Sequence, residues 1–479
     1  MDDDTRKALA GLMSKSVAAY FAGVKHAIHA LEHAAHTTAS FLESAVFPAL
    51  DSVVKMNEET AHSLISALGG QRPWREVMDE TTQRLESGHR FSELVHTWGR
   101  ALFGTARFAG ETVLAEDACF RLTYIPPTHG TQPAPAAGAR HAMADQPVAI
   151  FHAGGCIPYS DRVFRMAPGY DFYSRFLERG LPVYAMELRG DRDEVDYSGL
   201  TIDTLVDSIA AMSSHAFAHN RERKLVLEGY CGQGTQALTY ALARPEDAVR
   251  KFNLLSIFVA PVDGARCTRL AAAAAATPEL YREALMQLYG AMGNYVPGES
   301  VQVGLDLSLE ALFRKSWLGY FSTGWSRTDL GRVKHVDELT PAQRRDLAGA
   351  YWVSTDCSRR FPVPVGIARF TSALFRHGIA ADGALPYPVH GRTVSLTTLR
   401  DHLQVPVLGF YGGRDPVVPD ATAQILSSML GDRYTHVVHA QAGHISYVLS
   451  PKMWSRSSSA ALVPNPVDLI LAAGRAGME

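Results

Sequence analysis

The stretch that decides the fold is residues 228–238, "EGYCGQGTQAL", near the middle of the 479-residue chain. It follows the apolar run "KLVL" (224–227), which predicts a short buried strand, and leads into "ALTYALAR" (237–244), whose spacing predicts a helix. Three glycines surround Cys231 in the turn between them. Such a turn exposes a nucleophile at the end of a strand. Cys231 is therefore a candidate nucleophile, and the alternative is a small core residue in a tight turn.

Composition and charge narrow the class of protein. The chain is 47% hydrophobic and 20% charged, and its formal net charge of −3 gives no electrostatic reason to expect nucleic acid or an anionic membrane as a partner. The start "MDDDTRK" lacks a signal-peptide pattern, and no apolar run reaches the roughly 18–20 residues that span a bilayer. The five cysteines have no paired short spacing, which argues against a disulfide framework and a zinc site. We expect a reduced, cytoplasmic protein without a metal or a transmembrane segment.

The chain divides into a helical N-terminal region and an α/β domain. Residues 1–115 have helical apolar spacing throughout, and their histidines (His26, His29, His33 and His36) are interpreted as a polar helix stripe rather than a metal site. From 116 to 479, predicted strands alternate with helices, which indicates a mostly parallel sheet. The strands are expected within 120–126, 147–155, 182–190, 224–230, 254–264, 405–420 and 435–447. Between about 265 and 400 the alternation breaks into aromatic-rich helices (Trp317, Tyr320, Phe321, Trp325, Tyr351, Trp352), which predicts an inserted lid that shields the site from water, unless these rings are only helical core.

Three residues in one order indicate a catalytic triad. Cys231, Asp415 and His444 each follow a predicted strand, in the order nucleophile, acid, histidine that is typical of the α/β-hydrolase fold. His444 would take the thiol proton, and Asp415 would hold the imidazole in the productive tautomer. The backbone N–H groups of Gly232 and of Ile157, in the loop "HAGGCIP", would form the oxyanion hole.

Each member of this triad has an alternative. Asp415 could cap a following helix, and His444 could be an ordinary loop histidine. His436 and His439 are rivals to His444, but they fall within the strand pattern. Cys156 is expected to line the pocket rather than to react.

The same motifs resemble those of the polyhydroxyalkanoate synthase family. "GYCGQGT" is similar to its modified lipase box, in which cysteine replaces serine. "YWVSTDCSRR" (351–360), "VPVLGFYGGRDPVVP" (405–419) and "GHISYVLSP" (443–451) resemble its Tyr-Trp segment, aspartate strand and histidine loop, and "GGCIPYSDRVF" (154–164) is more loosely similar to its oxyanion-side segment. The chain departs from the family at Gln233, where the family has glycine, so that the side chain must point outward or shift its surroundings. An extra residue in "YWVSTD" leaves the match of Asp356 to the family aspartate open.

The resemblance implies an acyltransferase that moves (R)-3-hydroxyacyl groups from coenzyme A thioesters through an acyl-Cys231 to the hydroxyl end of a growing polyester. It implies no cofactor beyond the acyl-CoA substrate, and a cytoplasmic setting that includes the surface of polymer granules. The oligomeric state stays open, a homodimer included. A Cys-dependent thioesterase or polyester depolymerase is the alternative enzyme. A non-catalytic binding protein with a decayed site is the third reading, which intact Cys231, Asp415 and His444 disfavour.

Overall fold

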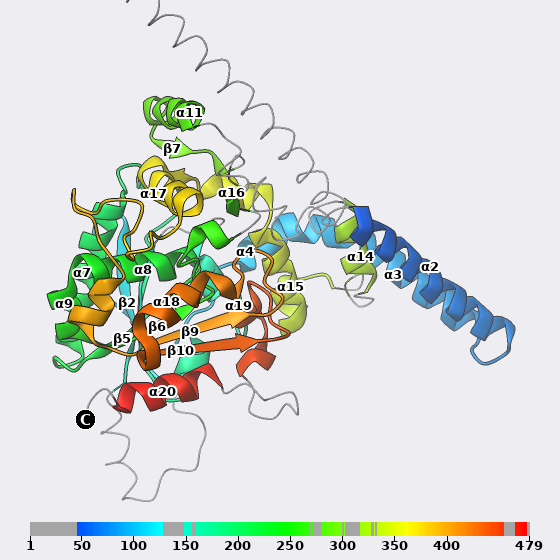
Figure 1. Ribbon diagram of the computed structural model, residues 1–479. Coiled ribbons are helices and arrows are strands. Elements are labelled where there is room, and N and C mark those ends of the chain that lie inside the picture. The colour runs from blue at the N-terminus through cyan, green and yellow to red at the C-terminus, as the bar shows by residue number, and fades with distance from the viewer. Residues whose placement is uncertain are drawn as a thin grey trace, which may run out of the picture.

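A computed structural model describes residues 46–127, 148–155, 160–267, 270–271, 279–298, 301, 317–326, 330, 333–454 and 465–476. The described residues form an eight-stranded sheet with helices on both sides and a helical arm at the N-terminal end (Figure 1). None of the helices in these ranges is both long and apolar enough to cross a membrane.

The sheet has the strand order β1-β2-β4-β3-β5-β6-β9-β10. Strand β2 runs antiparallel to its neighbours β1 and β4, and every other pairing in the sheet is parallel. This order, with a nucleophile turn after β5, is that of the α/β-hydrolase fold, so the predicted fold class is confirmed. The strands are β1 (Thr112–Glu116), β2 (Phe120–Ile125), β3 (Ile150–His152), β4 (Val183–Leu188), β5 (Leu225–Tyr230), β6 (Phe252–Phe258), β9 (Val407–Gly412) and β10 (Tyr434–His439).

The central strands are buried along their whole length. All residues of β4, β5, β6 and β9 are buried, as their nearly continuous apolar sequences predict for a parallel sheet covered on both faces. Strand β1 is a difference from the sequence analysis, which predicted helix up to residue 115. It is a short, mostly exposed edge strand, and it forms because β2 offers a free edge for antiparallel pairing.

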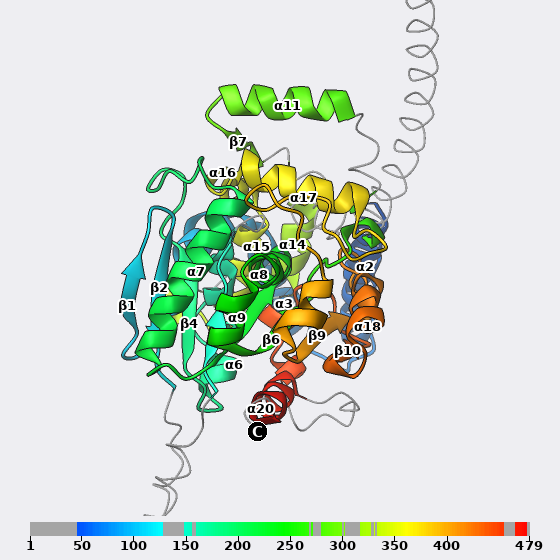
Figure 2. The ribbon, with the colours of Figure 1, turned by 60° about the vertical axis from the view of Figure 1, so that its left-hand side comes forward.

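Helices α7 (Ile202–His219), α8 (Gly232–Ala243) and α9 (Pro245–Lys251) lie along the sheet (Figure 2). Helix α7 begins at a capping box, in which the Thr201 hydroxyl accepts from the Thr204 N–H. The remaining helices of the sheet domain are α6 (Ser174–Leu177), α18 (Gln424–Leu430), α19 (Ser446–Leu449) and α20 (Pro466–Ala476). Short 3-10 turns lie at Asp161–Arg165, Gly264–Arg266, Val336–Glu338, Asp420–Ala423, Gly431–Arg433 and Pro451–Trp454.

The N-terminal arm is a pair of helices, α2 (Phe47–Leu68) and α3 (Trp74–Leu94), joined by a turn at 69–73 (Figure 1). A π-helical turn (Val95–Gly99) and α4 (Arg100–Leu102) connect the arm to the sheet domain. The histidine stripe at His26, His29, His33 and His36 lies outside the described residues.

The insertion between β6 and β9 is helical, as expected. Its aromatic helix α14 packs against α3 of the arm, where Phe321 contacts His89 with ring centroids 5.3 Å apart and Tyr320 lies 6.1 Å from Phe91. These two rings therefore form part of the core between the arm and the insertion. Of the two roles considered above, this is the core and not the shield over Cys231. The inserted elements are α11 (Glu279–Ala291), β7 (Tyr295–Val296), α14 (Trp317–Trp325), α15 (Pro341–Trp352), α16 (Thr355–Arg360), β8 (Val363–Pro364), α17 (Val365–His377) and a π-helical turn (Leu399–Leu403).

Candidate active site

Cys231 occupies the sharp turn between β5 and α8. Its backbone has φ 51° and ψ −128°, a conformation that residues with a side chain rarely adopt and that occurs preferentially at functional sites. The turn is tight because Gly229 and Gly234 touch: a Cβ on Gly229 would lie 2.7 Å from the Cα of Gly234. The glycines of the motif thus let helix and strand approach closely, and Cys231 stays only partly buried at the carboxyl end of the sheet.

The structure brings Cys231, His444 and Asp415 into one chain of contacts. The Nε2 atom of His444 lies 3.2 Å from the Sγ atom of Cys231, and its Nδ1 atom lies 2.8 Å from Oδ2 of Asp415. The three residues follow β5, β10 and β9, parallel strands whose carboxyl ends meet at the same edge. The arrangement has the geometry of nucleophile, base and orienting acid.

Asp415 is held by its own backbone surroundings. Its side chain is fully buried, and its Oδ1 atom accepts hydrogen bonds from the N–H groups of Val417 (2.8 Å) and Val418 (2.9 Å). Oδ2 is thereby turned toward the imidazole. Capping was the alternative role considered for Asp415. The carboxylate has both roles: Oδ1 caps the following turn, and Oδ2 contacts His444.

The electrostatics of the site favour a charged imidazole. Burial opposes the charged form of His444, but attraction to the Asp415 carboxylate and to the Cys231 side chain outweighs it and raises the pKa of His444 well above its usual value. Burial disfavours the thiolate form of two other cysteines. It raises the pKa of Cys119 to about 11 and also raises that of Cys267. These two thiols are therefore poor candidates for the nucleophile.

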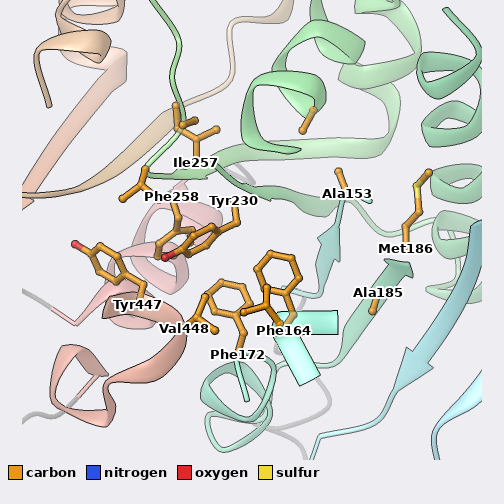
Figure 3. Packing of buried hydrophobic residues seen from close by; sticks show 14 of the residues in the cluster. Ala153, Phe164, Phe172, Ala185, Met186, Tyr230, Ile257, Phe258, Tyr447 and Val448 are labelled. Carbon is orange, nitrogen blue, oxygen red and sulfur yellow. The ribbon is translucent and has the colours of Figure 1, made fainter. Parts of the chain in front are cut away.

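Aromatic rings pack around the end of β5 that precedes Cys231. Tyr230, Phe258 and Phe410 are neighbours across β5, β6 and β9, and the rings of Phe258 and Phe410 stack with centroids 4.6 Å apart. Figure 3 shows Phe164 and Phe172 facing Tyr230 on this side of the sheet, with centroids 5.6 and 5.7 Å from it. This packing fixes the end of β5 that carries the nucleophile.

The expected oxyanion donors are only partly within the described chain. Gly232 is the first residue of α8, next to Cys231, as the prediction requires. Ile157 and Cys156 lie outside the described residues, so their roles stay predictions. The loop can be followed from β3 through Ala153 to Gly155.

The side chain of Gln233, which stands where the family has glycine, points into the protein. The expectation that it points outward is therefore wrong. The side chain is fully buried, and its Nε2 donates to the Gly155 carbonyl at 3.3 Å. Gln233 can be accommodated because Gly234, one residue further, makes the close contact with β5.

Two other histidines were considered above as alternatives to His444. His436 and His439 belong to β10, as predicted, and burial lowers the pKa of His436. The Asp356 carboxylate accepts from the Tyr351 hydroxyl at 2.8 Å, on the short helix α16. Within the described ranges, no group of three or more His, Cys, Asp or Glu side chains is placed to hold a metal ion.

Sequence reasoning missed a buried pair beneath the turn. His152 at the end of β3 and Glu228 on β5 are both fully buried, and the imidazole Nδ1 is hydrogen-bonded to the carboxylate Oε2. The signal was present as two polar residues in otherwise apolar strand sequences, "PVAIFH" and "KLVLE".

The chain was compared with protein families, curated proteins and solved structures, and similar proteins were found among the solved structures. No family model matches the chain, and no curated protein matches it. Among solved structures, a carboxylesterase of Bacillus subtilis is 12% identical, with a TM-score of 0.37, over 77% of this chain and 95% of the other. The mouse α/β hydrolase domain-containing protein 10 is 12% identical, with a TM-score of 0.35, over 76% and 96%. An epoxide hydrolase from hot-environment metagenomes is 16% identical, with a TM-score of 0.36, over 78% and 99%. The α/β-hydrolase fold of this chain is assigned from its own strand order and nucleophile turn.

Proposed function

We propose that this protein is an acyltransferase resembling polyhydroxyalkanoate synthases, which transfers (R)-3-hydroxyacyl groups from coenzyme A thioesters to the hydroxyl end of a polyester. The observation that carries the proposal is the Cys231–His444–Asp415 contact chain at a strained strand–helix turn, with Nε2 3.2 Å from Sγ. The family resemblance of the surrounding motifs supplies the substrate class.

In the loading step, His444 takes the proton of the Cys231 thiol, and the thiolate attacks the thioester carbonyl. A carbon–sulfur bond forms to Cys231 and the bond to the coenzyme A sulfur breaks. The leaving thiolate receives the proton from His444. The raised pKa of His444 suits it to hold that proton as an imidazolium while the negative charge is on sulfur.

In the transfer step, His444 accepts the proton of the acceptor hydroxyl as its oxygen attacks the acyl-Cys231 carbonyl. An ester bond forms, the thioester bond breaks, and the proton returns to the Cys231 sulfur. Asp415 keeps the Nδ1 atom of His444 engaged, so that Nε2 faces the reacting sulfur in both steps.

A cysteine nucleophile favours transfer over hydrolysis. An acyl-cysteine is itself a thioester, so its formation from acyl-CoA is close to thermoneutral and retains the reactivity needed to acylate a hydroxyl group. A serine ester would lose part of that reactivity. The competing function is a Cys-dependent thioesterase or depolymerase, in which water replaces the hydroxyl acceptor.

The test uses the purified full chain with 3-hydroxybutyryl-CoA. We expect coenzyme A release that is matched by ester-linked oligomer, and a transient acyl adduct in the intact-protein mass. Release matched by free 3-hydroxybutyrate would establish the hydrolase instead.

Cysteine variants then identify the nucleophile. Cys231→Ala should abolish both turnover and adduct while the protein stays folded, because the thiol is small and sits in a turn. Cys156→Ala and Cys119→Ala are the matched controls and should be nearly neutral. An adduct that persists in Cys231→Ala, or that maps to Cys156, would show that Cys231 is not the nucleophile.

A further inference from the structure

The loop that follows β3 begins with a tightly packed glycine segment. This glycine segment (residues 153–155, Ala-Gly-Gly) lies between β4 and α8. A Cβ on Gly154 would lie 2.5 Å from the backbone oxygen of Met186, and one on Gly155 would lie 1.9 Å from Oε1 of Gln236. The backbone of the segment is therefore packed directly against its neighbours, and its position depends on the groups that contact it.

On one face of the sheet, that contact comes from Gln233 of α8. The Nε2 atom donates to the Gly155 carbonyl at 3.3 Å, and because the acceptor is a carbonyl, the amide nitrogen must be the end that faces it. The Oε1 atom of Gln233 has no hydrogen-bond partner in the described part of the chain. A fully buried glutamine with a single hydrogen bond costs free energy, so it is expected only where that bond has a use.

On the opposite face, the contact comes from the His152–Glu228 pair. Glu228 holds the start of the segment twice: its side chain binds Nδ1 of His152, and its backbone oxygen accepts from the Ala153 N–H at 2.8 Å. Gly229, the next residue of β5, faces α8, so the alternation of a strand places Glu228 on the other face.

Aromatic rings enclose this pair. The imidazole of His152 lies edge-on to Phe164 at 4.5 Å and to Tyr173 at 5.4 Å between centroids. Its Nε2 has no hydrogen-bond partner among the described residues, which leaves Glu228 as the hydrogen-bond partner of the ring within them.

We propose that Gln233 and the His152–Glu228 pair are positioning residues that hold the glycine segment from the two faces of the sheet. They thereby fix the described start of the β3 loop, from which the predicted second oxyanion donor is expected to come. The inference rests on the proposed acyl chemistry at Cys231. It assigns to Gln233 the role of an anchor for this segment.

Two reagents separate this role from general structural damage. An alkyl trifluoromethyl ketone adds to the Cys231 thiolate: a carbon–sulfur bond forms, the carbonyl π bond breaks, and its oxygen becomes an oxyanion that needs the N–H donors. Iodoacetamide alkylates the same sulfur with loss of iodide and forms no oxyanion. In both reactions His444 takes the thiol proton, and with methyl as the alkyl group the ketone is about as small as iodoacetamide, so the ratio of the two reports on the oxyanion site. Peptide mapping confines the alkylation to Cys231, and protection of Cys231 from alkylation by the reversible ketone places the ketone on the same sulfur.

The first variant is Gln233→Met, which keeps the length of the side chain but cannot donate to Gly155. We expect the inhibition constant of the ketone to rise about 10-fold, below the 10²–10³-fold loss in rate for removal of an oxyanion donor itself, with an alkylation rate within about 2-fold of the wild type. Thr239→Ala is the matched control, because Thr239 is fully buried on the same helix and, within the described part of the chain, its hydroxyl donates to the Thr235 carbonyl rather than to the glycine segment. Neither reagent should distinguish it from the wild type.

The second variant, His152→Phe with Glu228→Leu, replaces the pair by apolar groups without leaving a buried charge unpaired. It should weaken the ketone in the same selective way. Combined with Gln233→Met, it should cost less than the product of the two separate effects, because both act on one segment.

Unchanged ketone affinity in Gln233→Met, equal losses with both reagents, or a wild-type protein that does not bind the ketone would overturn the inference. If the wild type forms no acyl adduct from acyl-CoA but shows the selective ketone pattern, the proposed function fails and the positioning role stands.

Discussion

The hydroxyl group of Tyr230 donates a hydrogen bond to the backbone carbonyl of His444 at 2.6 Å. Tyr230 is the last residue of β5 and precedes the nucleophile directly, whereas His444 comes from the loop after β10. The bond ties the loop of the base to the strand of the nucleophile. It therefore supports the 3.2 Å contact between His444 Nε2 and Cys231 Sγ.

Removing this bond should impair catalysis more than stability. Tyr230→Phe keeps the ring in its aromatic contacts but leaves the His444 carbonyl without its donor, at a cost of about 1–2 kcal/mol in unfolding free energy. Because the loop of the base is released, we expect kcat to fall about 10-fold, since small misplacements of catalytic groups are costly. Tyr447→Phe is the matched control, because that buried hydroxyl donates to the Tyr411 carbonyl at 3.1 Å rather than to the carbonyl of His444. Equal losses of kcat in the two variants would contradict the prediction.

The raised pKa of His444 has a consequence for stability. The folded state favours the protonated imidazole, so this stabilisation is fully present below the unfolded pKa of about 6.5 and is lost as the pH rises through the folded pKa. His444→Gln removes it. The difference in unfolding midpoint between wild type and variant, measured from pH 5 to 9, should be largest at low pH and should shrink as the pH rises. A difference that grows with pH would mean that burial, rather than Asp415, governs the imidazole.

Asp415→Asn should damage the orientation of the base. The amide oxygen can still accept from Val417 and Val418, but an NH₂ group then faces Nδ1 of His444 in place of a carboxylate oxygen. The imidazole is driven to the tautomer that carries hydrogen on Nε2 and cannot take the thiol proton. We expect kcat to fall about 10²-fold, less than the roughly 10⁴-fold of a serine triad, because a thiol ionises more readily. Asp420→Asn, at a half-exposed carboxylate outside the triad, should leave turnover unchanged.

Gly229→Ala should destabilise the nucleophile turn. The new Cβ would lie 2.7 Å from the Cα of Gly234, and neither backbone can yield without separating α8 from β5. Overpacking of this kind typically costs about 1–3 kcal/mol, which denaturant unfolding can measure. Gly349→Ala, within helix α15 and with open space around its Cβ, should be neutral or slightly stabilising. Comparable losses in both variants would show that the close approach of Gly229 and Gly234 is not limiting.

The sequence by itself determined the strands of the main sheet other than β1, together with the candidate triad. Fully buried parallel strands have nearly continuous apolar sequences, which is why "KLVLEGY" and "VPVLGFYGG" predicted β5 and β9. Cys231, Asp415 and His444 each follow such a strand, and strands that run parallel bring their ends to one edge. Local sequence therefore sufficed to predict that these three residues meet.

Only the tertiary structure decided the contacts that depend on neighbours distant in sequence. Strand β1 was missed because five residues with little burial form a strand only when β2 offers an edge. The sequence left open whether the aromatic rings of α14 shield the site or form core, and Phe321 and Tyr320 pack on the arm, since the partner of a helix face is not encoded in its periodicity. The direction of Gln233 and the His152–Glu228 pairing were settled by the register of β3 beside β5 and by the approach of α8 to Gly155. Whether a polar side chain is buried with a partner depends on what the fold places opposite it, and no local pattern contains that information.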